Sequence, residues 1–282
     1  MIPVRVALIG FGEVGQALAG PLGNGRALRI YDRLFDAVAA PLPDQGCRTA
    51  VAAVAGADLV ISAVTAAQTA IVARAVAPHL AVGAWYMDLN SASPSQKIAA
   101  AEAVDGAGGR YVEVSVMSPI HPKGMASPLL LGGPHAEAFV PVAQALGFSG
   151  ACFHSAVPGR AAATKLCRSV LVKGMEALVI EAFLAARHYG VEDTILASLG
   201  NVLPHPDWPG HARYMMSRAL RHGVRRAEEM EEAAATVAAS GLAPGMAAAT
   251  AQVQRWAARF GDAADSPDLA TMLDAVRQEL TP

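Results

Sequence analysis

Short apolar runs rich in β-branched residues alternate with alanine-rich segments through the first half of the chain. The segments between several of these runs predict helices, for example at Thr65–Ala77 and Pro94–Val104. Alternation of this kind is typical of right-handed β-α-β crossovers, so we expect an α/β fold with a doubly wound, mostly parallel sheet. Ligands of such sheets bind at the carboxyl ends of the strands. The predicted strands are Val4–Ile9, Ala27–Tyr31, Leu59–Val64, Ala84–Leu89, Tyr111–Met117, Leu129–Leu131 and Ala151–Phe153.

The pattern changes after Pro158-Gly159, where no further strand-like run occurs. Residues 160 to about 189 predict one continuous helix that ends near Tyr189-Gly190, because glycine commonly follows a helix C-terminus. Further helices are expected at about 211–240, 244–260 and 266–279. The chain is therefore predicted to have an α/β domain at 1–156 and an all-helical domain at 157–282.

Composition narrows the classes of partner. The residues are 53% hydrophobic and 16% charged, and the formal net charge is −2. This balance argues against a nucleic-acid or anionic-membrane surface, and no apolar run reaches the length of a membrane span. A strand at the N-terminus, in place of a basic and apolar leader, favours a cytoplasmic protein.

The metal-binding residue types are scattered. No group of His, Cys, Asp and Glu has the spacing of metal ligands, so we expect no metal. Cys47, Cys152 and Cys167 are far apart and are interpreted as small, buried, unreactive residues.

A G-x-G-x-x-G motif, Gly10, Gly12 and Gly15, follows the first predicted strand and opens a helix. Asp32 ends the next strand, where its carboxylate can accept hydrogen bonds from an adenosine ribose. This arrangement predicts a Rossmann-type dinucleotide-binding domain with the pyrophosphate at the helix N-terminus. Asp32 favours NAD because it repels the 2′-phosphate of NADP, whereas Arg33 leaves NADP as the alternative. The predicted cofactor-binding residues are Gly10, Phe11, Gly12, Glu13, Val14, Gly15, Asp32, Arg33, Val64, Thr65 and Asn90.

The long predicted helix carries Lys165 on the same face as Ser169, Val172 and Glu176. Hydride transfer from an alcohol requires a group that takes the hydroxyl proton, and a lysine whose pKa is lowered by partial burial can do this. The alternative is a solvated lysine on a helix surface, which is the usual environment of this residue.

In these motifs the sequence resembles the β-hydroxyacid dehydrogenases, the group that contains 3-hydroxyisobutyrate and 6-phosphogluconate dehydrogenases. The resemblance covers nearly the whole chain and rests on the glycine motif, on Asp88–Pro94 and on Gly159–Lys165. It implies an NAD(P)-dependent oxidoreductase that acts on a small hydroxy acid, with Lys165 as the general acid/base. It also implies a homodimer built on the helical domains, which the long apolar helix favours as well.

The chain departs from this family where the substrate carboxylate binds. The family's Asp-x-Pro-Val-Ser-Gly-Gly corresponds to Glu113–Pro119, with Met117, Ser118 and Pro119 in place of the serine and the paired glycines. Because a proline cannot donate a backbone N–H, we expect a different small, anionic substrate. The predicted substrate-binding residues are Ser91, Ser93, Ser115, Met117, Ser118, His121, Ser169, Arg225 and Arg226.

A charged stretch in the helical part, His222–Glu231, resembles a less characterised branch of the family. His222, Arg225, Arg226 and Glu229 share one helix face. Either this face is exposed and carries an Arg225–Glu229 ion pair, or one of the arginines binds a substrate carboxylate or phosphate.

Two other functions stay open on the sequence. Imine reductases and reductive aminases resemble the same two-domain plan but usually lack the lysine. A protein that binds NAD(P) without catalysis would need the glycine motif but no proton carrier beside it.

Overall fold

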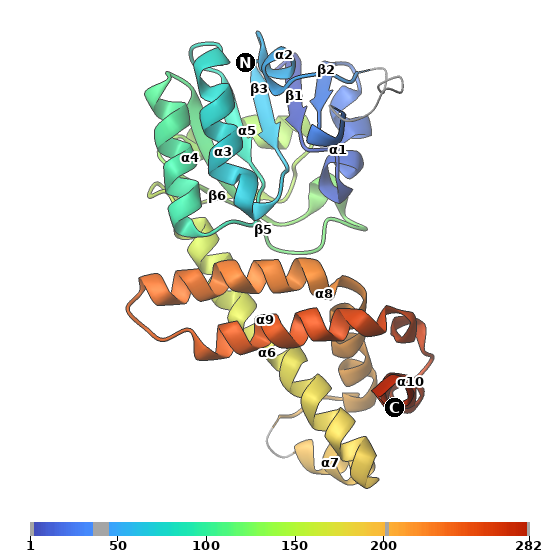
Figure 1. Cartoon of the computed structure of the whole chain (residues 1–282). Coiled ribbons are helices and arrows are strands. Elements are labelled where there is room, and N and C mark those ends of the chain that lie inside the picture. The colour runs from blue at the N-terminus through green and yellow to red at the C-terminus, as the bar shows by residue number, and fades with distance from the viewer. Residues whose placement is uncertain (1–2, 36–44, 201–202, 281–282) are drawn as a thin grey trace. The chain divides into compact units, whose positions relative to one another are not determined.

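The computed structural model describes residues 3–35, 45–200 and 203–280. The chain divides into two compact units, Met1–Lys165 and Leu166–Pro282. The dividing point lies inside helix α6 (Arg160–Tyr189), whose first turns belong to the first unit (Figure 1). The boundary expected from the sequence, at 156/157, lies just before this helix.

One seven-stranded sheet forms the centre of the first unit, in the order β2-β1-β3-β4-β5-β6-β7. Every neighbouring pair is parallel except β5 and β6, which confirms the predicted mostly parallel sheet. All the predicted strands are present, and their ends differ from the prediction by one or two residues at most. The strands are β1 (Arg5–Ile9), β2 (Ala27–Tyr31), β3 (Leu59–Ser62), β4 (Trp85–Asp88), β5 (Arg110–Val116), β6 (Leu129–Gly132) and β7 (Ala151–Ser155).

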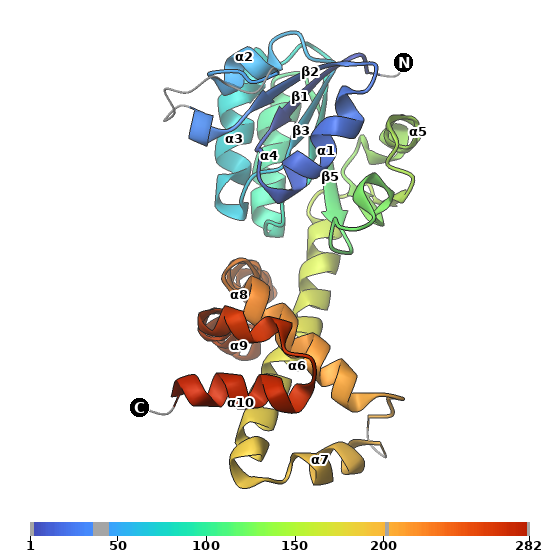
Figure 2. The ribbon, with the colours of Figure 1, turned by 90° about the vertical axis from the view of Figure 1, so that its right-hand side faces the viewer.

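Helices cover both faces of this sheet. Val6 and Leu8 of β1 pack on the face covered by α1 and α5, whereas Ala7 and Ile9 pack on the face covered by α2, α3 and α4 (Figure 2). A sheet covered on both faces needs apolar residues at successive positions, which explains the continuous apolar runs in the sequence. The helices are α1 (Glu13–Gly23), α2 (Ala50–Val54), α3 (Thr69–Val76), α4 (Pro94–Gly106) and α5 (Ala136–Leu146).

The second unit contains only helices among its described residues. Helix α6 has the predicted bounds and ends before Gly190, which has φ +67°. Helices α8 and α9 lie side by side (Figure 1), and Gly223 permits this approach because a Cβ there would lie 2.1 Å from the backbone oxygen of Gln254. Helix α7 was not predicted, because it is short and its N-cap, Val191, provides no capping side chain. The remaining helices are α7 (Glu192–Leu199), α8 (Trp208–Ala239), α9 (Gly245–Ala257) and α10 (Leu269–Leu280).

The cysteines are more exposed than predicted. Cys152 and Cys167 are exposed and Cys47 is half-buried, so the prediction that all three are buried is wrong. Cys152 lies on the edge strand β7, and Cys167 lies on an outer face of α6. All three are free thiols.

No described helix is long and apolar enough to span a bilayer. Within residues 3–35, 45–200 and 203–280, no three side chains of His, Cys, Asp or Glu are grouped so that they could hold a metal ion.

Candidate functional site

The carboxyl ends of β1 to β4 line up at one edge of the sheet, beside Glu113 in the middle of β5. Tyr31, Ile9, Ser62, Asp88 and Glu113 occupy one register row across β2, β1, β3, β4 and β5. Backbone hydrogen bonds continue past this row, because the next residue of β1, β3 and β4 donates to the neighbouring strand. The loops after β1 to β4 therefore begin at one common line, where ligands of such sheets bind.

The glycine motif forms the turn between β1 and α1. Gly10 has φ +96°, and a Cβ there would lie 2.3 Å from the backbone oxygen of Ala63. A Cβ on Gly15 would lie 2.1 Å from the backbone oxygen of Gly10, so these two glycines are required by packing inside the protein. Gly12 differs, because a Cβ there would meet nothing within 4 Å. As the N-cap of α1, Gly12 leaves open the position at which a helix N-terminus binds a phosphate, so the loop fits a dinucleotide.

Asp32 is tied directly to this turn. Its Oδ2 accepts a hydrogen bond from the backbone N–H of Phe11 at 2.7 Å, and its Oδ1 accepts one from Leu34 N–H at 2.9 Å. The carboxylate therefore lies beside the glycine loop at the end of β2, as expected for a residue that binds an adenosine ribose. Arg33 is exposed at the start of the following short 3₁₀ helix.

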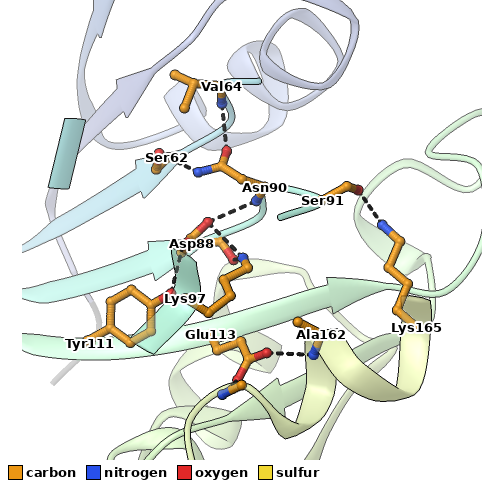
Figure 3. A network of polar contacts seen from close by, with 11 residues as sticks. Ser62, Val64, Asp88, Asn90, Ser91, Lys97, Tyr111, Glu113, Ala162 and Lys165 are labelled. Carbon is orange, nitrogen blue, oxygen red and sulfur yellow. Dashed lines mark hydrogen bonds and ion pairs between the residues drawn. The ribbon is translucent and has the colours of Figure 1, made fainter. Parts of the chain in front are cut away.

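The remaining predicted cofactor residues lie after β3 and β4. Asn90 is buried and uses both ends of its amide: Oδ1 accepts from Val64 N–H at 2.7 Å, and Nδ2 donates to Ser62 Oγ at 3.1 Å (Figure 3). Asn90 thus connects the ends of the two strands. Thr65 is exposed and lies at the N-cap position of a short 3₁₀ helix, next to this connection, without a capping hydrogen bond from its side chain.

Lys165 lies against the loop that follows β4. Its Nζ donates a hydrogen bond to Ser91 Oγ at 2.5 Å (Figure 3). Both side chains are half-buried and belong to the first unit, together with the glycine loop. Two residues that are far apart in the sequence, from separate predicted motifs, are therefore in direct contact.

A buried polar network anchors the strand before Ser91. Asp88, Lys97 and Tyr111 are all 0% exposed. Asp88 Oδ1 lies 2.9 Å from Lys97 Nζ and also accepts from Asn90 N–H, while Oδ2 accepts from the Tyr111 hydroxyl at 2.7 Å. Burial and the nearby Asp88 carboxylate raise the pKa of Tyr111 well above its usual value, so the hydroxyl keeps its proton and donates. The network fixes both ends of the turn on which Ser91 lies.

Glu113 connects β5 to α6. Its carboxylate is buried and accepts hydrogen bonds from the N–H groups of Gly159 at 2.7 Å and Ala162 at 2.5 Å (Figure 3). These are amides of the first turn of the helix that carries Lys165, and such amides have no partner within a helix.

Lys97, Tyr111 and Glu113 were not predicted as site residues, although a signal for one of them was visible in the sequence. A single acid, Glu113, within the mostly apolar run Arg110–Val116 requires a buried partner, whereas Lys97 lies among other polar residues of α4 and gives no such signal. The partner of Glu113 is a helix start that only the fold identifies.

The predicted substrate loop after β5 is mostly committed to local contacts. Ser115 is buried within β5, and the backbone N–H of Met117 donates to the Pro128 carbonyl at 2.9 Å. Ser118 Oγ donates to the Pro119 carbonyl at 3.1 Å, while His121 is exposed. Ser93 is buried beside Ser95, with 3.2 Å between the two hydroxyl oxygens. Among these residues, Ser118 and His121 are the polar side chains nearest the end of β5 that retain exposure.

The predicted residues of the helical unit lie in two ion-pair groups. Arg226 is buried, pairs with Glu176 and donates to Gln254 Oε1 at 3.3 Å. Its neighbour Arg225 is exposed and pairs with Glu229 at 3.3 Å, which confirms the ion pair expected for this helix face.

Ser169 belongs to the second of these groups. The hydroxyl accepts from Lys173 Nζ at 3.2 Å, and Lys173 in turn pairs with Glu229 at 2.7 Å. On the face predicted along α6 beyond Lys165, Ser169 is buried and Glu176 pairs with Arg226 of α8, whereas Val172 is 38% exposed.

Two family models match the chain. One, described as the NAD binding domain of 6-phosphogluconate dehydrogenase, matches residues 5–157. The other, described as Domain of unknown function (DUF1932), matches residues 186–257. A search of the curated proteins found no match.

Solved structures share the architecture along almost the whole chain. A conserved hypothetical protein from Sinorhizobium meliloti 1021 is 33% identical, has a TM-score of 0.75, and aligns over 97% of this chain and 95% of its own. A 3-hydroxyisobutyrate dehydrogenase from Mycobacterium tuberculosis, solved with L-serine, is 19% identical with a TM-score of 0.73, over 98% and 100% of the two chains.

A reductive aminase from Aspergillus terreus is 20% identical with a TM-score of 0.55, over 97% of this chain and 99% of its own. The two enzymes share the fold with this chain at identities too low to transfer an activity. The first family model matches more than half of the sequence, and the matched residues include the glycine motif and Asp32. The protein therefore belongs to the family of the 6-phosphogluconate dehydrogenase NAD-binding domain, within the β-hydroxyacid dehydrogenase superfamily.

Proposed function

We propose that this protein is an oxidoreductase that interconverts a small hydroxy acid and its carbonyl compound, with Lys165 as the proton carrier. The hydrogen bond from Lys165 to Ser91 carries this proposal. It puts an amine at the carboxyl edge of the sheet, in the same unit as the open Gly12 turn and Asp32. A protein that only bound the dinucleotide would have no use for a basic group at this edge.

The chemistry assigned to the chain is a proton transfer. A bound nicotinamide supplies the hydride acceptor in oxidation and the hydride donor in reduction. In oxidation, the neutral Lys165 amine takes the hydroxyl proton while the C–H bond on the same carbon breaks and a C=O bond forms. Ser91 accepts an N–H of Lys165 and thereby orients the nitrogen. In the reverse direction Lys165 returns the proton to the carbonyl oxygen.

NAD is the proposed cofactor, rather than NADP. Asp32 holds the loop through Phe11 N–H, so a 2′-phosphate placed there would meet a carboxylate that is fixed in position. The exposed Arg33 directly after Asp32 favours NADP. The ratio of kcat/KM for NADH and NADPH decides between the two.

The substrate is proposed to be small and anionic. Ser118 and His121 after β5 replace the backbone donors that paired glycines would provide, and we assign them to the substrate carboxylate. Arg225 and Ser169 are the other candidates, in the helical unit. The pairing of Arg226 with Glu176 favours a structural role for that residue.

Reductive amination is the second candidate function, because the Aspergillus terreus reductive aminase shares this fold. Lys165 favours the hydroxy acid, since transfer of an alcohol proton requires a base. An NADH sensor without catalysis is the remaining alternative.

A homodimer through the helical unit is proposed as the functional form. Leu171, Met175, Leu178, Ala182, Ala185 and Tyr189 repeat at alternating steps of four and three along α6, and Leu171, Leu178 and Tyr189 are 67%, 57% and 76% exposed. Such a repeat forms an apolar seam on one helix side, suited to packing against another helix. Leu178→Glu should give a monomer by sedimentation at micromolar concentration, whereas Ile71→Glu on α3 should not change the mass.

A panel of substrates tests the activity. The purified protein is assayed with NADH, NAD, NADPH and NADP against short hydroxy acids, including 3-hydroxyisobutyrate and L-serine, and against cyclohexanone with allyl amine. Turnover of a hydroxy acid or its carbonyl partner supports the proposal. Turnover restricted to the ketone with amine indicates a reductive aminase, and tight NADH binding without any turnover indicates a sensor.

A further inference from the structure

Glu113 is a fully buried acid in an apolar strand, and its two oxygens bind the start of another element. Oε2 accepts from Gly159 N–H at 2.7 Å and Oε1 from Ala162 N–H at 2.5 Å. An ionised carboxylate in an apolar environment is very unfavourable unless such donors compensate it. The two amides in turn lack partners within α6, so the acid and the helix start stabilise each other.

The charge of Glu113 strengthens this connection. A carboxylate at a helix N-terminus interacts favourably with the helix dipole, and hydrogen bonds to an ionised acceptor are about twice as strong as neutral ones. Glu113 thereby fixes the first turn of α6 to β5. Lys165 lies three residues after Ala162, one turn further along the same helix side.

The same helix start is packed tightly against the loop that carries Ser91. Gly159 has φ +86°, and a Cβ there would lie 3.1 Å from Cβ of Pro94, the first residue of α4. Ser91 lies just before that proline, so a shift of the α6 start would change the Lys165–Ser91 contact (Figure 3).

The space around the acid is matched to a glutamate. A Cβ on Gly132 of β6 would lie 2.7 Å from Glu113 Oε2 and 3.4 Å from Ala161 Cβ. The gap at Gly132 therefore leaves room for the long side chain to reach the helix.

We propose that Glu113 is a positioning residue: its carboxylate fixes the first turn of α6 and so holds Lys165 Nζ against Ser91. The inference rests on the proposed function, because it concerns the placement of the proposed proton carrier. It goes beyond that function in assigning the placement to a residue that touches neither substrate nor cofactor.

Glu113→Gln tests the role of the charge, because it preserves the shape but turns one acceptor into a donor. The assay uses the compound of the substrate panel above that the wild type turns over. Val112→Ala is the control, because it destabilises β5 without changing Glu113. We expect kcat of Glu113→Gln to fall by about 10- to 100-fold with the NADH dissociation constant unchanged, since a misplaced catalytic group loses rate rather than cofactor affinity. Amide hydrogen exchange of Gly159–Lys165 should become faster in Glu113→Gln and stay unchanged in Val112→Ala.

Two changes of side-chain size, at Gly132 and at Glu113, give a second test that retains the negative charge. Gly132→Ala should displace the Glu113 carboxylate and lower kcat, and Glu113→Asp, which is one methylene too short to reach both amides, should also lower kcat although it keeps the charge. If both variants keep the wild-type kcat, the contact does not position Lys165.

Two results would overturn the inference, and they are distinguishable. If Glu113→Gln keeps kcat within about two-fold of the wild type while Lys165→Ala loses it, Glu113 has no positioning role and the proposed function stands. If Lys165→Ala also keeps its kcat, the proposed function fails and the inference fails with it.

Discussion

Lys97 and Asp88 form an ion pair in which both side chains are 0% exposed, with 2.9 Å between Nζ and Oδ1. Lys97 Nζ also donates to the Asp88 carbonyl at 3.0 Å, so the lysine binds both the side chain and the backbone of the last residue of β4. The strand end before Ser91 is thus fixed by a charge that has no access to water.

Removal of this lysine should destabilise the first unit severely. Lys97→Met leaves the buried Asp88 carboxylate without its cation, and such a loss costs about 3–5 kcal/mol of unfolding free energy. Tyr111→Phe removes only one hydrogen bond to the same carboxylate and should cost about 1–3 kcal/mol. Urea unfolding measures both. If Lys97→Met costs no more than Tyr111→Phe, the pair does not act as a buried charge.

Arg226 and Arg225 are adjacent but should respond differently to the same substitution. Arg226→Met leaves buried Glu176 without its partner and should cost about 3 kcal/mol or more. Arg225→Met removes a pair in which the arginine side chain is 51% exposed, and should cost under about 1 kcal/mol. Equal effects in urea unfolding would contradict the assignment of Arg226 to the core.

Substitutions at Gly10 and Gly12 should have different effects, the first on protein stability and the second on cofactor binding. Gly10→Ala places a Cβ against the Ala63 carbonyl at a φ of +96°, so it should lower the melting temperature. Gly12→Ala meets no protein atom within 4 Å, so it should leave the melting temperature nearly unchanged. Its methyl group would occupy the phosphate side of the turn, and we expect NADH binding by calorimetry to weaken at least about ten-fold. Unchanged NADH affinity in Gly12→Ala would argue against this turn as the dinucleotide site.

Asp32 should control the choice of nicotinamide. Asp32→Ala removes the carboxylate that disfavours a 2′-phosphate, so the ratio of kcat/KM for NADPH to NADH should rise. Arg33→Ala is the companion variant and should lower that ratio if Arg33 contacts the phosphate. A wild-type preference for NADPH, or an Asp32→Ala ratio equal to that of the wild type, would show that Asp32 does not bind the adenosine ribose.

Acid should weaken the attachment of β1. Hydrogen bonds from Arg5 are the main reason that the pKa of Asp58 falls to about 2, from 3.8 for the free side chain. A lowered pKa in the folded state gives stability that is present above about pH 4 and is lost as the pH falls toward about 2. Asp58→Asn should therefore show a smaller fall in melting temperature over this range than the wild type. The same fall in both proteins would mean that another carboxylate is responsible.

The strands could be predicted from the sequence because each contains a short run rich in apolar residues, and β1, β3 and β4 in the middle of the sheet are buried on both faces. The ends of Ala27–Tyr31 agree with the prediction, and the long helix, predicted to end near Tyr189-Gly190, ends at Tyr189, where Gly190 follows it. The strand β6 was predicted but its antiparallel direction could not be, because an apolar run reads the same in either direction.

The polar anchors were harder to predict, because their partners are remote in sequence. Glu113 binds amides 46 and 49 residues away, and no local pattern pairs an acid with a distant helix start. Arg225 and Arg226 show the same limit: helix periodicity puts both on one side, but packing against α9 decides which is buried. The contact between Lys165 and Ser91 likewise joins a helix and a loop that are 74 residues apart in the sequence.

The rate of Lys165→Ala on the hydroxy acid or carbonyl compound that the wild type turns over tests the central claim most directly. The variant should bind NADH with the wild-type affinity by calorimetry and lose about 100- to 10,000-fold in kcat, which is the usual contribution of a general acid/base. A Lys165→Ala protein that binds NADH normally and retains most of its kcat would contradict the account.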